Sequence, residues 1–257
     1  MMMRAYPPIR LSVLIIFAAL CLNCSDLYAK KEHVVKRFAA KRYDGKKIVV
    51  RQVSPPRNVG GILPPEHMVA KAAERFYKAL DVLPENFVKR SRMRYVTFYI
   101  NPTLDGKGVG GLAYQDRIIL NVHFSSGTVY HELFHVFDKQ RVQAKWKRLN
   151  NKKFVYTGSE YYPAELSRKK RNRKDENLSS GRFDQDFVSR YAMSNELEDR
   201  AETFAHMICE KERFLLRTAK SPVLKKKMEY IIDMTDKRKL LGKTFWREIF
   251  KKDVSAK

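Results

Sequence analysis

A short apolar segment with two histidines constrains this chain more than any other feature. The segment TVYHELFHVFDKQ, residues 128–140, contains the motif His-Glu-Leu-Phe-His at positions 131–135. On a helix, residues i and i+4 lie on one face with Cβ atoms about 5–6 Å apart. The residues around the motif are apolar, so the helix is expected to be buried, where polar side chains are costly unless they have partners. The fold must therefore bury a helix with two imidazoles on one side.

The spacing of His131 and His135 suits two ligands of one zinc ion. Their ring nitrogens can both reach one ion at about 2.0–2.1 Å. Glu132 is rotated about 100° from His131 on a helix, so it flanks the ion and suits a general base for a metal-activated water. The alternative is a core helix whose histidines are satisfied by hydrogen bonds, because so short a motif also occurs by chance. A third protein ligand elsewhere in the sequence would favour the zinc site over the core helix.

The segment SRYAMSNELEDRAETFAHM, residues 189–207, is the best source of that ligand. Glu198 and Glu202 lie at i and i+4 of an expected helix, with Asn195 and Glu198 as a capping pair at its start. One carboxylate can bind the metal while the other holds the far nitrogen of a ligand histidine. The alternative is an amphipathic helix whose acidic face balances a basic protein.

Two other side chains compete with Glu198 for the third position. Asp199 is about 100° away from it on the helix, and His206 is about 12 Å farther along the helix axis. The remaining histidines show no ligand spacing: His33, His67 and His123. Glu198 is therefore the preferred ligand.

The segments HELFH and YAMSNELEDRAETFA resemble the catalytic region of zinc peptidases of the anthrax toxin lethal factor type. They also resemble a broader set of exported bacterial zinc peptidases with the same layout. The resemblance covers roughly residues 94–206 and is specific in the two motifs. It implies a zinc ion bound by His131, His135 and Glu198, and it implies a zincin-like fold.

The same resemblance implies roles for further residues. Glu132 corresponds to the base, and Tyr191, seven residues before Glu198, corresponds to the donor that stabilises the oxyanion. Glu202 falls at a supporting position beside the ligands. The segment GGLAYQDRIILNV resembles the sheet edge that holds peptide substrates, and its implied substrate-binding residues are Gly111, Leu112, Ala113 and Tyr114.

The order of expected elements predicts one α+β domain with a small mixed sheet, an active-site helix and a mostly helical C-terminal half. Alternation predicts strands, and apolar residues at helical spacing predict helices. The expected strands cover about 46–53, 92–100 and two segments around a turn at 115–116. The expected helices cover about 66–80, 128–148, 194–216, 222–233 and 236–251.

The N-terminal residues 1–29 have the layout of a secretory signal peptide. Arg4 and Arg10 precede the apolar run LSVLIIFAALCL, and the small Ala29 is a plausible cleavage position. A secreted or cell-envelope location follows, with an uncleaved anchor or a lipoprotein linked through Cys24 as alternatives. Residues 30–64 are expected to form a basic arm with a short strand, and residues 65–257 a catalytic domain with a basic inserted loop at about 150–182.

The formal net charge of +24 predicts attraction to polyanions. Residues 139–174 contain 13 Lys or Arg, eight of them at or beyond residue 152 and clustered most densely at 168–174. Export favours an anionic envelope polymer or a membrane surface over nucleic acid as a partner. Cys209 is the one cysteine beyond the leader, so no intramolecular disulfide is expected, and it is expected to be a buried packing residue. The protein is expected to be a monomer.

Two functions from different classes follow from these features. The first is a zinc-dependent endopeptidase that hydrolyses a peptide or protein substrate outside the cell or in its envelope. The alternative is a non-catalytic basic envelope-binding protein with a structural or vestigial zinc site. Metal content and the loss of activity with a chelator distinguish the two.

Overall fold

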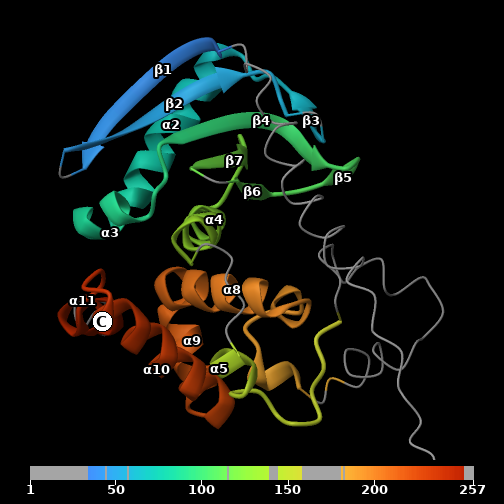
Figure 1. The fold of residues 1–257 in the computed structure, drawn as a ribbon, viewed down its shortest axis with the longest axis vertical. Coiled ribbons are helices and arrows are strands. Elements are labelled where there is room, and N and C mark those ends of the chain that lie inside the picture. The colour runs from blue at the N-terminus through green and yellow to red at the C-terminus, as the bar shows by residue number, and fades with distance from the viewer. Residues whose placement is uncertain are drawn as a thin grey trace, which may run out of the picture.

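A mixed sheet and a group of C-terminal helices lie on opposite sides of one central helix, α4 (Ser126–Asp138) (Figure 1). The computed structural model describes residues 34–43, 45–56, 58–114, 116–138, 144–157, 181 and 183–251. The strands are β1 (Val34–Tyr43), β2 (Lys46–Val53), β3 (Val59–Ile62), β4 (Tyr95–Leu104), β5 (Lys107–Gly108), β6 (Gly111–Tyr114) and β7 (Arg117–Asn121). The other helices are α2 (Glu66–Leu80), α3 (Glu85–Arg90), α5 (Ala144–Lys147), η1 (Asp184–Asp186), η2 (Tyr191–Met193), α8 (Glu196–Cys209), α9 (Lys211–Thr218), α10 (Pro222–Lys237) and α11 (Lys243–Phe250).

The sheet has the strand order β1-β2-β4-β7-β6, and β3 and β5 both pair with the C-terminal part of β4. Strands β2, β4 and β7 are parallel, whereas β1 and β6 run antiparallel to their neighbours. Among the described strands β6 pairs with β7 alone, so it forms an edge of the sheet. This edge lies beside α4.

Helix α2 covers one face of the sheet through an apolar stripe. Its buried residues recur at helical spacing and include Val69, Ala72 and Phe76. The ring of Phe76 meets that of Phe98 in β4 edge to face, with 6.3 Å between centroids. Such burial of regularly spaced apolar side chains is the main force that holds an amphipathic helix on a sheet.

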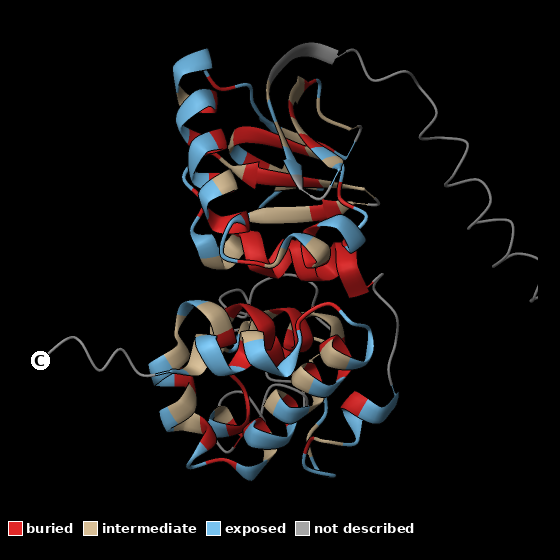
Figure 2. Cartoon of the chain, turned by 90° about the vertical axis from the view of Figure 1, so that its left-hand side faces the viewer, coloured by how far each residue is buried: buried red, intermediate tan, exposed pale blue. Residues whose placement is uncertain are grey.

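One core continues from the sheet through α4 into the C-terminal helices. The ring of Phe134 in α4 lies 4.8 Å from that of Phe204 in α8, and Phe204 lies 6.0 Å from Trp246 in α11. Figure 2 shows this continuity as buried residues on both sides of α4. The predicted α+β class, with a mixed sheet and a helical C-terminal half, is confirmed.

Within the predicted basic arm of residues 30–64, the expected short strand is β2, and residues 34–43 form the further strand β1. Strand β1 pairs with β2 along its length, through a turn in which Gly45 has a φ of 80°. Lys41 forms an ion pair with Asp81 at 2.5 Å. Pairing with β2 places this basic segment in the sheet, and the core includes Ile48 and Val50 of β2.

Three predicted helices are shorter or divided. The region predicted as one helix over 128–148 contains two elements in its described residues, α4 and α5. The helix predicted over 194–216 is divided at Glu210, whose φ of −123° and ψ of 38° lie outside the helical region. The last helix begins at Lys243 rather than near 236, because Lys239 has a left-handed φ of 53°.

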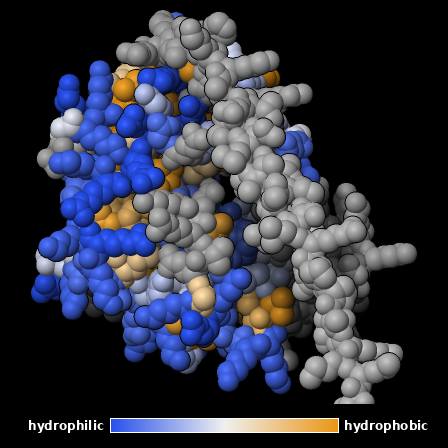
Figure 3. Space-filling view, viewed as in Figure 1, coloured by the Kyte–Doolittle hydropathy of each residue, from blue (hydrophilic) through white to orange (hydrophobic). Residues whose placement is uncertain are grey.

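The predicted leader at 1–29 and most of the predicted basic loop, including the 168–174 cluster, lie outside the described residues. None of the helices in the described ranges is long and apolar enough to cross a membrane. The described surface seen in Figure 3 is mainly hydrophilic, with small apolar patches. Large exposed apolar side chains are scattered along the chain: Ile62, Leu63, Val82, Val155 and Leu216.

Candidate metal centre

Helix α4 carries the His-Glu-x-x-His motif in its buried middle. The helix begins after β7, where the hydroxyl of Ser125 accepts a hydrogen bond from the backbone N–H of Thr128 at 3.2 Å. This contact caps the first turn. Every residue from Val129 to Asp138 is buried, because the sheet contacts one side of the helix and α8 the other. Polar side chains in this stretch therefore need partners within the protein or a bound ion.

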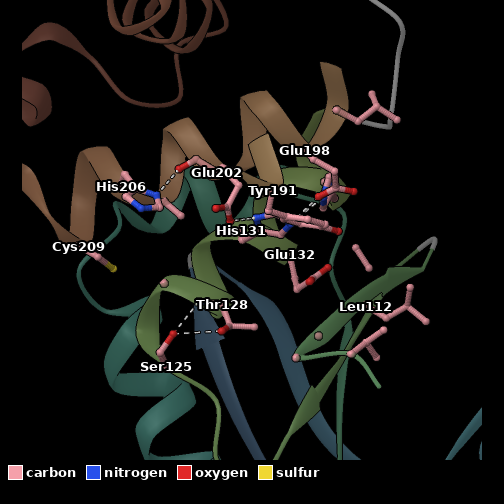
Figure 4. Close-up of a pocket in the computed structure, with 18 of the residues that line it drawn as sticks. Leu112, Ser125, Thr128, His131, Glu132, Tyr191, Glu198, Glu202, His206 and Cys209 are labelled. Carbon is pink, nitrogen blue, oxygen red and sulfur yellow. Dashed lines mark hydrogen bonds and ion pairs between the residues drawn. The ribbon is translucent and has the colours of Figure 1, made fainter. Parts of the chain in front are cut away.

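Three side chains from α4 and α8 converge at one point (Figure 4). His131 Nε2 lies 3.0 Å from His135 Nε2 and 2.9 Å from Glu198 Oε2, and the remaining distance, from His135 Nε2 to Glu198 Oε2, is 3.2 Å. In the described part of the chain this is the one group of three His, Cys, Asp or Glu side chains arranged to hold a metal. Two ligands of a tetrahedral zinc ion are roughly 3.3 Å apart. The triangle therefore has nearly the dimensions that zinc requires.

The electrostatics of the three side chains also fit a cation. Burial lowers the pKa of His131, but hydrogen bonds with Glu198 and Glu202 outweigh burial and hold that pKa well above its usual range. Burial raises the pKa of Glu198, but hydrogen bonds with His131 and His135 outweigh it and hold that pKa well below its usual range. The carboxylates thus stabilise positive charge at the imidazoles. A divalent cation bound to these donors would supply the positive charge that the carboxylates stabilise, so the residues fit zinc.

The start of α8 determines where Glu198 points. The side chain of Asn195 accepts hydrogen bonds from the backbone N–H groups of Leu197 and Glu198, at 2.9 and 3.0 Å. The predicted cap at Asn195 is therefore confirmed. The Glu198 carboxylate does not return to this cap in the reciprocal manner of a capping box, because it faces the two histidines.

Glu202, one turn after Glu198, holds the other nitrogen of the first histidine. Its Oε1 lies 2.8 Å from His131 Nδ1, and its Oε2 accepts a hydrogen bond from the Ser189 hydroxyl at 2.6 Å. With Nδ1–H donating to this carboxylate, the lone pair of His131 Nε2 is directed at the ligand cluster. The structure thus places Glu202 in contact with a candidate ligand and not with the metal position.

Glu132 lies between the ligand helix and the edge strand β6. Its side chain is 6% exposed. A Cβ at Gly111 would lie 2.7 Å from Glu132 Cγ and 2.8 Å from Glu132 Oε1, so the glycine allows the carboxylate to approach the strand. Burial raises the pKa of Glu132, and the positive charges of His131 and His135 oppose that rise. The carboxylate is therefore shielded from water on one side and open to the cavity on the other.

Tyr191 reaches the same cluster from η2. Its ring stacks on the ring of His131 with 5.9 Å between centroids, and its hydroxyl is hydrogen-bonded to Glu198. Burial, followed by the charges of Glu198 and Glu132, raises the pKa of Tyr191 well above its usual range. The phenol therefore stays neutral at physiological pH and keeps a proton to donate.

A cavity of about 520 Å³ connects these groups. Of the predicted substrate-binding residues, Gly111, Leu112 and Ala113 line it, whereas Tyr114 does not. Tyr114 lies near the Arg117 guanidinium instead, which is 6.0 Å from its ring centroid. Tyr114 is the last residue of the edge strand β6, outside the lining of this cavity.

Several lining residues were not predicted. They include Ser125, Thr128, Asn195, Cys209 and Glu210. Cys209 is exposed at the cavity (Figure 4), so the expectation of a buried packing residue is wrong. A sequence signal existed for Asn195 as a helix cap, but the others reach the cavity only because α4 and α8 pack side by side.

The competing ligands point elsewhere. Asp199 is fully buried on a different face of α8, where its carboxylate lies 2.9 Å from Lys227 Nζ. His206 lines the cavity, but its Nδ1 lies 2.9 Å from the backbone carbonyl of Glu202. Among the described histidines, His67 and His123 do not line the cavity. The geometry thus agrees with the choice of Glu198.

A family described as "Putative zinc-binding metallo-peptidase" matches residues 97–252. A crystal structure of a "putative zinc-binding metallo-peptidase" from Bacteroides caccae is similar to the chain with a TM-score of 0.44 and 13% sequence identity, covering 74% of this chain and 78% of that one. No curated protein matches the sequence.

The family match extends over more than half of the chain and includes the two histidines of α4 and Glu198. It confirms the prediction of zinc as the cofactor. The protein belongs to the family described as "Putative zinc-binding metallo-peptidase".

Proposed function

We propose that the protein is a zinc-dependent endopeptidase. The observation that carries this proposal is the position of Glu132. Its buried carboxylate lies beside the converging donors of His131, His135 and Glu198, and it also lies against the edge strand β6. A zinc site with a purely structural role has no need of a carboxylate that is held next to its ligands and open to a cavity.

The chain's own residues can carry out peptide hydrolysis in this arrangement. Zinc on the three ligands supplies a Lewis acid that polarises a carbonyl group and makes water more acidic. Glu132 takes a proton from the water as a new C–O bond forms at the peptide carbonyl. It then transfers this proton to the amine nitrogen as the C–N bond breaks.

Tyr191 stabilises the negative charge that develops on the carbonyl oxygen. Its neutral hydroxyl lies in the cavity beside His131 and Glu198 and can donate a hydrogen bond to that oxygen. This role follows the pattern of the lethal factor-like peptidases, in which a tyrosine seven residues before the ligand glutamate acts on the oxyanion. The spacing of Tyr191 and Glu198 supports that finer assignment.

The edge strand supports binding of an extended peptide. Gly111, Leu112 and Ala113 line the cavity, and in the described sheet β6 has a neighbour on one side alone. A substrate backbone can therefore add to β6 as a further strand beside the cavity. This mode of binding places a peptide bond near Glu132 without requiring a particular sequence.

The decisive experiment compares the wild-type protein with the Glu132→Gln variant. Glutamine keeps the size of the side chain and removes its capacity to accept a proton, so zinc should remain bound at one ion per chain while cleavage of a proteome-derived peptide library collapses. Metal content by mass spectrometry and cleavage profiling measure the two quantities. The exposed Glu212→Gln change on α9 is the matched control and should retain both.

Two results would contradict the proposal. Equal cleavage by the wild-type protein and Glu132→Gln would exclude the proposed base. A wild-type protein that holds zinc and cleaves nothing in the library would favour a non-catalytic envelope-binding protein instead.

We also propose that the enzyme is exported and acts in the cell envelope or outside the cell. The support is the charged, apolar and small-residue layout of residues 1–29. Sequencing the N-terminus of the protein isolated from the producing cells tests this. A mature chain that begins just after Ala29 in the envelope or medium is the expected result, and a chain that keeps Met1 in the cytosol would contradict it.

A further inference from the structure

A second concave site lies at the opposite end of the sheet from the zinc ligands. The parallel strands β2, β4 and β7 all begin at this end, with Lys46, Tyr95 and Arg117 as their first residues. Helix α4, in contrast, follows the carboxyl end of β7. The groove has a volume of about 1010 Å³ and shares no lining residue with the zinc cavity.

The lining of this groove is strongly basic. Six cationic side chains line it, from Lys46, Lys47, Arg51, Lys89, Arg92 and Arg94. We call the groove that these six side chains line the basic groove. Asp116 is the single acidic residue among the described side chains of its wall. Asp44, which precedes β2, lies outside the described residues.

Four of the six cations of the basic groove are poorly neutralised. Asp116 is already 4.0 Å from Arg117 Nε, and it is the one acid of the wall. Among the described carboxylates, none forms an ion pair with Lys47, Arg51, Arg92 or Arg94. Like charges held together in this way repel one another unless an anion lies between them.

Two side chains of the wall, those of Arg51 and Lys46, are fixed in position by contacts with the protein. The guanidinium of Arg51 lies over the Tyr95 ring at 3.3 Å, and its Nε is buried with no hydrogen-bond partner among the described residues. Lys46 Nζ is anchored by the backbone carbonyls of Val88 and Lys89, at 3.3 and 2.9 Å. Burial, and then the charge of Arg94, lowers the pKa of Lys46 to about 8, with Asp116 opposing the shift.

The chemistry of the wall identifies the class of ligand. Arginine presents a planar fork of N–H donors that matches the oxygens of a phosphoryl group, and stacking on an aromatic ring preorganises that fork. Six cations against one carboxylate suit an anion of high charge density. We propose that the basic groove binds a phosphoryl group, whether from a soluble phosphate compound or from a lipid headgroup. This site is independent of the proposed peptidase activity.

Calorimetric titration of the purified protein with pyrophosphate, at about 0.15 M salt to screen diffuse attraction, tests the proposal. The double variant Arg51→Gln/Arg94→Gln removes two cations from the basic groove, and we expect it to weaken binding by at least about tenfold. The matched control is Lys225→Gln/Lys226→Gln, which removes two cations from the exposed face of α10 and should leave binding unchanged. Zinc content and the thermal unfolding midpoint of each variant establish that it is folded.

Flotation with phosphatidylglycerol vesicles, compared with phosphatidylcholine vesicles, distinguishes the sources. Loss of vesicle binding in the groove variant alone would support the site and identify a lipid headgroup. Unchanged vesicle binding together with loss of pyrophosphate binding in the groove variant would support the site and identify a soluble phosphate. The proposal is overturned if pyrophosphate does not bind, if both double variants weaken it equally, or if a hexaglutamate peptide binds the groove as tightly as pyrophosphate.

Discussion

Asp138 and Arg200 form a buried ion pair between the two helices that hold the candidate zinc ligands. Arg200 Nη2 and Nε lie 2.6 and 2.9 Å from the same Asp138 carboxylate oxygen, and the Arg200 and Asp138 side chains are 0% and 3% exposed. Asp138 comes three residues after His135, and Arg200 comes two residues after Glu198. The pair therefore holds α4 and α8 together next to the metal centre.

Removing one member of this pair should destabilise the protein strongly. The changes Asp138→Leu and Arg200→Met should each lower the free energy of unfolding by roughly 3–5 kcal/mol, because each leaves an uncompensated buried charge. The double variant should lose much less than the sum of the two, since it leaves no charge behind. Urea denaturation of the four proteins measures this. Strictly additive losses would show that the two charges do not compensate each other.

The hydrogen bond from His131 Nδ1 to Glu202 should contribute to metal affinity. We expect Glu202→Ala to weaken zinc binding by about 10–100-fold, because the ring then loses the partner that orients Nε2. Glu202→Gln keeps an acceptor oxygen and should lose less. Competition with a chelator of known zinc affinity measures the dissociation constants, with exposed Glu212→Ala as the control. Wild-type affinity in Glu202→Ala would exclude this positioning role.

Adding one methyl group at Gly111 should impair catalysis without removing zinc. The Cβ of Gly111→Ala would lie within 3.0 Å of Glu132 Cγ and Oε1, so the carboxylate must move. A displacement of about 1 Å can cost on the order of a hundredfold in rate. We expect kcat/KM on a cleaved library peptide to fall between about tenfold and a hundredfold at constant zinc content.

Gly110→Ala is the matched control for that change. Its Cβ would meet Thr128 Cγ2 at 3.9 Å, which is an ordinary contact. Activity should therefore be retained. Equal loss in Gly110→Ala and Gly111→Ala would point to a general disturbance of β6 rather than to displacement of Glu132.

The amine of Lys46 should react unusually fast with an acylating reagent. Burial and the charge of Arg94 lower its pKa from 10.5 to about 8, so about half of the amine is neutral at pH 8. Arg94→Gln removes a positive charge, raises the pKa of Lys46 and should slow the reaction at pH 8. Peptide mass spectrometry after brief acetylation measures the rate. An unchanged rate in Arg94→Gln would contradict the electrostatic coupling.

The elements that were predicted correctly are those specified by local patterns. The i, i+4 spacing of His131 and His135 places both on one face of any helix, and Asn195 caps a helix through its immediate neighbours. Glu198 and Glu202 likewise share a face, and the structure brings both to the histidines. The α+β class followed from the order of apolar periodicities along the chain.

Other features depend on residues far apart in the sequence. Asp199 directly follows Glu198, yet it pairs with Lys227 of α10, and this becomes apparent once the helices are packed. The basic groove likewise combines β2 with the loop after α3 and the start of β4.

By itself, the sequence determined the candidate ligands and the elements that carry them, because the geometry of a helix relates residues three or four positions apart. Tertiary packing decided how these elements meet. It brought Glu132 against Gly111, tied Asp138 to Arg200 and paired Asp199 with Lys227. The physical reason is that burial and charge compensation act through space, so they become defined only when distant segments share one core.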